Sequence, residues 1–235
     1  MRFRCLLVLI VGVAAACGRY SELDSFSAGA PDTGATDAGA SDVDDGAAAA
    51  EIDSGSGDAD PDAAPPCVPV TKKKSPTLLA SGGGPGPEWS DPGGASVEDG
   101  LQASVGLTSS GTGNSTSEAL VAGGFGFAIP DGAVIRGLTV HLRRRAPKPS
   151  NEDVRDAELR LGPNSVPSGE DRAAHPWPAN FVTVEYGGPE DLWGLSLTPA
   201  MLNAEAFSII VRARNHGSAG DAHVDAIAVS VTYCE

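Results

Sequence analysis

The side chains with the most potential for chemistry in this 235-residue sequence are its serines and its four histidines. A serine hydrolase needs a hydroxyl that is hydrogen-bonded to a base, usually a histidine oriented by a carboxylate. His141, His175, His216 and His223 are scattered, and no Gly-x-Ser-x-Gly motif marks an exposed nucleophile. We therefore expect no catalytic activity. A hydrolase assembled from distant residues is the enzymatic alternative.

Metal-binding patterns are equally sparse. The sequence has no metal-ligand histidine pair, no Cys-x-x-Cys and no phosphate-binding loop, so we expect no cofactor and no metal. Asp225 shares the strand parity of Ile227 and should point towards a core, where a carboxylate needs a partner. The candidates are Arg214, backbone amides, or a structural calcium ion shared with Asp221 or Asp99. We favour the hydrogen-bonded structural role.

Three tryptophans are the candidates for a binding surface. Trp89, Trp177 and Trp193 fall in loops or at strand ends, and Asp191 lies close to Trp193. Aromatic faces beside carboxylates suit sugar recognition, so these four residues form a candidate carbohydrate site. The alternative is that the rings cap the ends of a hydrophobic core.

The N-terminus carries a targeting signal. Residues 1–4 are basic, residues 5–13 are apolar, and Ala14-Ala15-Ala16 precedes Cys17. The apolar run is too short to span a bilayer and has the layout of a secretory signal. The segment resembles the lipobox of bacterial lipoproteins, which implies cleavage before Cys17 and its acylation; ordinary cleavage with Cys17 unmodified is the alternative. By this resemblance we expect export and anchoring in the outer membrane, facing the periplasm or the cell surface.

An acidic segment follows the signal. Residues 18–66 hold ten Asp, two Glu and one Arg, a net charge of −11 out of −15 for the chain. Such a composition cannot form a core, and its charges repel one another. We predict a signal peptide over 1–16, a disordered linker over 17–66 and one folded domain over 67–235. Neither part is basic enough to suggest nucleic acid, so the expected partners are the membrane, through the lipid, and a glycan or surface protein.

Two cysteines bracket the folded domain. Cys67 begins it and Cys234 is the penultimate residue. With Cys5 removed and Cys17 acylated, they are the only pair left in an oxidising compartment. We expect an internal disulfide that joins the first strand to the last; free thiols or an intermolecular bond are the alternatives.

The elements that must position these residues are short strands. Residues 123–146 pack many apolar side chains between glycines and prolines, which predicts a strand, a turn at 130–132 and a long second strand. Alternation predicts further strands, listed as residues 101–107, 118–129, 181–186, 207–213 and 227–233, with long loops at 75–100 and 162–180. Thr198-Pro199 predicts one helical turn near 199–204. We expect an all-β, jelly-roll-like antiparallel β-sandwich that excludes residues 1–66.

The strongest local prediction is a central hairpin between residues 138–142 and 157–161. One antiparallel register places apolar side chains opposite each other on one face and basic side chains opposite acidic ones on the other face. It pairs Leu142 with Ala157, Val140 with Leu159, Arg143 with Asp156, and His141 with Glu158. Ile135 has the wrong parity for this face, so we expect a bulge near Gly137.

Several segments carry a family resemblance. They are Trp89-x-x-Pro92, Asp99-Gly100, residues 125–135, Asp191-Leu-Trp-Gly194 and residues 224–233. They resemble a family of uncharacterised domains in bacterial secreted and phage-associated proteins, over roughly residues 75–234. The Ala/Asp/Gly spacer resembles those of myxobacterial surface lipoproteins. The family implies the fold and no mechanism. We therefore expect a lipid-anchored binding or display protein without catalytic activity, with a tryptophan-based carbohydrate-binding module as the alternative and a hydrolase as the second alternative.

Overall fold

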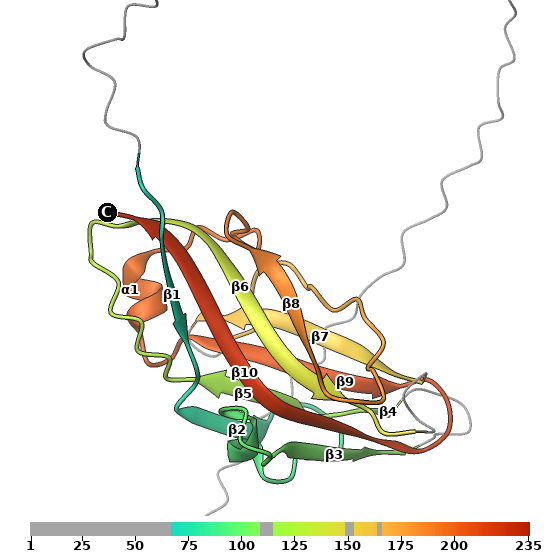
Figure 1. Cartoon of the computed structure of the whole chain (residues 1–235). Coiled ribbons are helices and arrows are strands. Elements are labelled where there is room, and N and C mark those ends of the chain that lie inside the picture. The colour runs from blue at the N-terminus through green and yellow to red at the C-terminus, as the bar shows by residue number, and fades with distance from the viewer. Residues whose placement is uncertain (1–66, 109–114, 149–152, 164–165) are drawn as a thin grey trace, which may run out of the picture. The chain divides into compact units, whose positions relative to one another are not determined.

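The computed structural model describes residues 67–108, 115–148, 153–163 and 166–235. The predicted signal peptide, Cys17 and the acidic linker lie outside the described residues. In the part of the chain that is described, strands dominate and form two antiparallel sheets around one hydrophobic core (Figure 1). No helix among these residues is long and apolar enough to cross a membrane. The predicted antiparallel β-sandwich is confirmed.

Within the described ranges, each sheet has five strands. Sheet A contains, in spatial order, β1 (Val70–Lys74), β10 (Gly220–Cys234), β6 (Val134–Arg145) and β8 (Val182–Gly188), and β3 (Ala103–Leu107) also pairs with β10. Sheet B contains β2 (Leu78–Gly82), β5 (Ala119–Gly123), β9 (Ser208–Asn215) and β4 (Ser115–Thr116), with β7 (Val154–Gly162) pairing with β9. The helical elements in this described part of the chain are the 3-10 turn η1 (Pro92–Ala95) and α1 (Pro199–Asn203).

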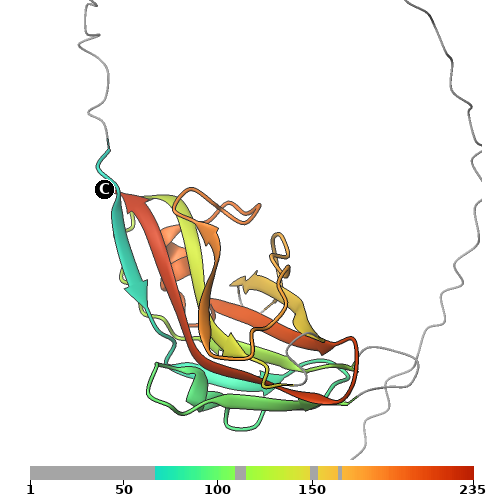
Figure 2. The same cartoon turned by 45° about the vertical axis from the view of Figure 1, so that its right-hand side comes forward.

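Consecutive strands alternate between the two sheets from β5 to β10. This alternation is the jelly-roll arrangement that the sequence predicts. The long strand β10, red in Figures 1 and 2, lies between β1 and β6. β10 is therefore the central strand of sheet A and contacts more neighbours than any edge strand can.

The predicted hairpin between β6 and β7 is wrong. β6 pairs with β10 and β8, so that Val140 lies opposite Val229, whereas β7 pairs with β9 in the other sheet. Val140 and Leu159 are both buried, and they face the core from opposite sheets. Alternation correctly predicts both strands and their buried faces. It does not show whether two such strands are hydrogen-bonded in one sheet or face each other across the core from opposite sheets.

The predicted charge pairs fail with the hairpin. Arg143 and Arg145 point outward, but Arg144 points into the core, where it is fully buried. Asp156 is therefore the partner of Arg144 and not of Arg143. Glu158 lies on the outer face of sheet B and pairs with Arg212 through a 2.8 Å contact between Oε2 and Nε.

Other local predictions are confirmed. Thr198 caps α1 by accepting a hydrogen bond from the backbone of Met201 at 3.3 Å. The register of β6 on β10 shifts between Ile135 and Gly137, which is the expected bulge. The long loop predicted at 75–100 is wrong in part, because it contains β2 and η1.

The strand predicted over 118–129 ends early, at Gly123. Beyond it, Gly124, Gly126 and Ala128 have positive φ angles of 67°, 57° and 52°. Left-handed residues at every second position interrupt the ladder. The residue after each of them still buries its side chain in the core, namely Phe125, Phe127 and Ile129. The Asn203 side chain at the end of α1 holds this segment through hydrogen bonds of 2.9 and 2.8 Å with the backbone of Ile129.

A disulfide joins Cys67 to Cys234, with their Cα atoms 5.7 Å apart. Next to it, Val70 of β1 pairs with Tyr233 of β10. The bond that the sequence predicts between the first and last strands is therefore confirmed. It fixes the start of the described chain to the end of the central strand of sheet A.

A buried polar cluster bridges the two sheets. Asp156 from β7 accepts hydrogen bonds from Trp177 Nε1 at 2.7 Å and from the Tyr186 hydroxyl at 2.9 Å. Arg144 from β6 donates through Nη2 to the Tyr186 oxygen at 2.7 Å and lies 3.5 Å from Asp156 Oδ2. The Arg144 guanidinium also lies over the Trp177 ring, 5.0 Å from its centroid. The ion pair is thus surrounded by partners, as a buried charge requires.

Candidate functional site

The outer face of sheet A carries a row of three polar side chains from three strands. The Ser230 hydroxyl on β10 lies 2.8 Å from His141 Nε2 on β6, and His141 Nδ1 lies 3.0 Å from Glu185 Oε1 on β8. The His141 side chain is 13% exposed and that of Glu185 is 66% exposed. We call these residues the Ser-His-Glu row. The predicted partner of His141, Glu158, is in the other sheet.

Strand register creates this row. His141 lies directly opposite Ala228 on one side and Glu185 on the other. Because alternate residues of a strand share a face, Ser230 is the next outward residue of β10 after Ala228 and reaches His141 diagonally. No sequence motif links positions 141, 185 and 230, so only the sheet brings them together.

The surroundings of His141 keep its ring neutral near pH 7. Burial is the largest effect and lowers its pKa from the ordinary value of 6.5; the Lys73 ammonium lowers the pKa further, while Glu185 raises it. A neutral imidazole has one N–H donor and one acceptor nitrogen. Since the Glu185 carboxylate accepts, the proton sits on Nδ1, and Nε2 is left to accept the Ser230 O–H.

A groove of about 200 Å³ lies beside the row on the same face. Its lining comprises Lys73, Ser75, Val97, Glu98, His141, Arg143, Thr183, Ala226 and Ala228. The two alanines are outward residues of the central strand β10, where small side chains leave room between β6 and β1. Lys73 and His141 belong to this lining and flank Ser230, which is not part of it. We call this hollow the sheet A groove.

Arg143 and Asp225 brace one wall of the sheet A groove. Arg143 Nε lies 2.6 Å from Asp225 Oδ2, and its Nη2 lies 3.1 Å from Glu98 Oε1. Asp225 is 3% exposed and sits at the β10 bulge between Val224 and Ala226. The buried carboxylate expected at this position is present, but its partner is Arg143 and not Arg214.

The calcium candidates do not come together. Asp99 Oδ1 accepts a hydrogen bond from the backbone of Leu101 at 2.9 Å, and Asp221 is an exposed residue opposite Gly106. Among the described residues no three His, Cys, Asp or Glu side chains are grouped as a metal site requires.

The three tryptophans are core residues. Trp89, Trp177 and Trp193 are 3%, 1% and 0% exposed. Each indole N–H donates inside the protein, as in the 2.8 Å bond from Trp193 to the carbonyl of Leu138. Asp191, the fourth candidate, accepts from Arg172 Nη2 and from the Trp193 backbone, each at 2.8 Å. With these exposures no tryptophan offers a ring face to a sugar, which supports the core-capping interpretation.

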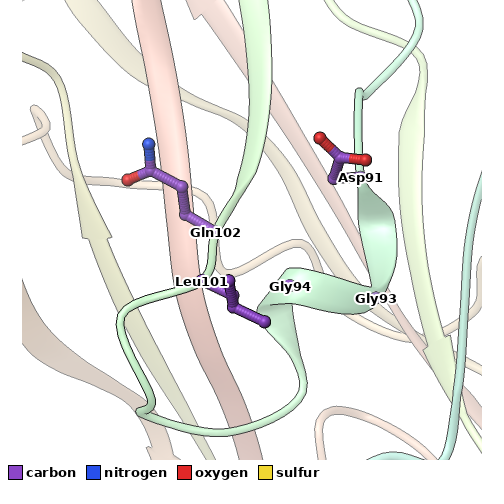
Figure 3. Close-up of a pocket in the computed structure, with 5 residues that line it drawn as sticks. All are labelled: Asp91, Gly93, Gly94, Leu101 and Gln102. Atoms are coloured by element: carbon purple, nitrogen blue, oxygen red, sulfur yellow. The ribbon is translucent and has the colours of Figure 1, made fainter.

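A larger hollow of about 350 Å³ lies near η1, lined by Asp91, Gly93, Gly94, Leu101 and Gln102 (Figure 3). Figure 3 shows that the Asp91 and Gln102 side chains belong to separate segments and do not point towards one another. The rest of the lining is glycine backbone and one leucine. Of these two hollows, the sheet A groove therefore carries more ionisable side chains.

Comparisons with known proteins do not assign the domain. No family model matches the chain, and no curated protein matches it. The class of protein that its fold defines is a disulfide-linked, jelly-roll-like β-sandwich. The resemblances to bacterial lipoproteins and to an uncharacterised domain family stay predictions from sequence.

Proposed function

We propose that this protein is an exported, lipid-anchored binding domain whose ligand site is the sheet A groove. Cys17 carries the lipid, the acidic segment after it acts as a spacer, and the β-sandwich is displayed at the outer membrane. The observation that carries the binding role is the groove itself, a polar hollow on an outer sheet face with a floor of Ala226 and Ala228.

The chemistry of the groove suits a saccharide. Hydroxyl-rich ligands need donors and acceptors side by side, together with a small apolar surface for the sugar ring. Lys73 and Arg143 supply donors, Glu98 supplies an acceptor, and the alanine floor supplies the apolar contact. This site replaces the loop tryptophans as the carbohydrate-binding candidate, because their rings are buried.

Filling the floor of the groove should abolish ligand binding. We expect Ala228→Val to weaken affinity at least about tenfold, since the added methyl groups occupy ligand space and leave the core unchanged. The measurement is a glycan array on the full-length protein in detergent, followed by titration calorimetry with the best glycan. Ala80→Val is the matched control, because Ala80 is an exposed residue of β2 in the other sheet. Equal affinities for both variants, or no glycan bound, would refute the proposal.

The lipid anchor is tested independently at Cys17. We expect Cys17→Ser to move the protein from the membrane fraction to the soluble fraction, because more than one acyl chain is needed for stable anchoring and all are lost together. Incorporation of an alkyne fatty acid, detected by blotting, measures the modification. Cys5→Ser serves as the control and should leave the label in place. Fatty-acid label that persists in Cys17→Ser would contradict the lipid anchor at Cys17. The proposal that the sheet A groove binds a ligand would not be affected.

A further inference from the structure

The Ser-His-Glu row has the arrangement of an activated nucleophile. We propose that Ser230 is acylated by small carboxylic esters, with His141 as the general base and Glu185 as the residue that positions it. This activity goes beyond ligand binding and departs from the sequence expectation of a domain without catalysis. It does not depend on the proposed saccharide.

The atoms are in the order that nucleophile activation requires. The base nitrogen Nε2 lies 2.8 Å from the hydroxyl, and the other nitrogen is held by a carboxylate at 3.0 Å. Serine is a weak nucleophile unless an adjacent base removes its proton, and a base does so best when a third group fixes its tautomer. His141 is neutral near pH 7 and is therefore ready to accept that proton.

The sheet A groove is the approach to the hydroxyl in this proposal. Its lining includes His141 and Lys73, and Ser230, which is outside the lining, is hydrogen-bonded to His141 and lies opposite Lys73 in the ladder. A hollow of about 200 Å³ accommodates an acyl group of a few carbons and part of its alcohol. The substrate class is therefore a short-chain ester.

The oxyanion must be stabilised by a side chain. Ser230 pairs with Lys73 on β1 and with Thr139 on β6. The backbone N–H groups around it therefore take part in the hydrogen bonds between these strands and do not bind the oxyanion. The Lys73 ammonium is the candidate, because Lys73 lies opposite Ser230 in the ladder and its charge acts on His141. Each positioned oxyanion donor that a hydrolase lacks typically lowers the rate by about 10²–10³. Because backbone donors are absent from this proposed site, we expect slow turnover.

The chemistry balances with the ester and water as the only reactants. As Ser230 Oγ bonds to the carbonyl carbon, His141 Nε2 takes the hydroxyl proton. The C–O bond to the alcohol then breaks, and the leaving alkoxide takes that proton from His141. Water then attacks the acyl carbon while His141 Nε2 accepts a proton from it. The bond from that carbon to Ser230 Oγ breaks, His141 returns the proton to Oγ, and the carboxylic acid leaves.

Covalent labelling tests the proposal on the full-length protein. We expect a fluorophosphonate probe to add to Ser230, identified by peptide mass spectrometry, and p-nitrophenyl acetate to be hydrolysed slowly. Ser230→Ala should abolish both signals, and His141→Ala should lower them at least about 100-fold. Thr232→Ala is the matched control, since this outward β10 hydroxyl bonds to Thr71 at 3.1 Å and should leave labelling unchanged when mutated. Thermal melts confirm that each variant is folded.

The pH dependence separates a catalytic role from a structural one. The charged groups around His141 are Lys73 on β1, Glu185 on β8 and the Arg143–Glu98 pair at the groove. Since the pKa of His141 is lowered, labelling should be complete at pH 7 and fall as the pH drops below 6.5. Glu185 raises that pKa, so Glu185→Gln should slow labelling and move the fall to lower pH. A folded protein that is not labelled at Ser230, or a rate that is unchanged in His141→Ala, would overturn the proposal.

Discussion

Replacing Asp156 by alanine is expected to destabilise the folded domain by about 3–5 kcal/mol, because it leaves the fully buried Arg144 charge without its anion. The variant also removes the acceptor of the Trp177 and Tyr186 hydrogen bonds. Urea unfolding followed by tryptophan fluorescence measures the loss. The fluorescence is informative because Trp177 lies in the cluster itself.

An exposed ion pair provides the control for this prediction. Arg172 and Glu170 are 2.8 Å apart, and the Glu170 side chain is 58% exposed. Glu170→Ala should cost less than about 1 kcal/mol, because solvent already screens the pair. If Asp156→Ala and Glu170→Ala unfold at the same urea concentration, the buried cluster does not stabilise the sandwich.

The same cluster predicts a loss of stability in alkali. Burial is the main cause that raises the pKa of Tyr186 above 10, followed by the charge of Asp156. A folded-state pKa above the unfolded value means that the stabilisation is complete below pH 10 and is lost as the pH rises through the folded value. Tyr186→Phe should therefore be less stable at pH 7 and show a weaker dependence on pH above 10.

Removing the disulfide is the second large effect that we expect. The double variant Cys67→Ser/Cys234→Ser should lose about 2–5 kcal/mol, because the bond closes a loop with a sequence separation of 167. The loss should begin at β1, which is an edge strand held otherwise by its pairing with Val229 to Tyr233. Differential scanning calorimetry of the exported protein measures the change.

A reducing agent supplies the control for the disulfide. Reduction should lower the melting temperature of the native chain to that of the double variant and leave the double variant itself unchanged. A native chain whose melting temperature does not respond to reduction would show that the bond adds no stability. Cys67→Ser alone should behave like the double variant, because a single remaining thiol cannot close the loop.

Features that depend on residues adjacent in the chain could be predicted from the sequence. Alternation placed the strands that became β3, β8, β9 and β10, and the Thr198-Pro199 pair placed α1. The parity of Ile135 located the bulge, and elimination among four cysteines selected the disulfide. The β-sandwich class followed from these elements.

Which strands are neighbours could not be predicted in this way, because it depends on how the whole domain packs. Val140 and Leu159 both face the core, and a strand pattern of period two is satisfied whether the partner lies beside it or across the core from it. The predicted hairpin paired β6 with the next long strand in the sequence, whereas β6 actually pairs with β10 and β8, which are more distant along the chain. The positive φ angles at Gly124, Gly126 and Ala128 likewise broke a segment that alternation had predicted as strand.

At the candidate site, too, the orientation of a side chain could be predicted from the sequence, but its partners could not. Period-two alternation places His141 on the outward face of its strand, but its partners Ser230 and Glu185 lie 89 and 44 residues away along the chain. Strand register brings those residues together, and register depends on core packing of the whole sandwich, which no stretch of sequence contains on its own.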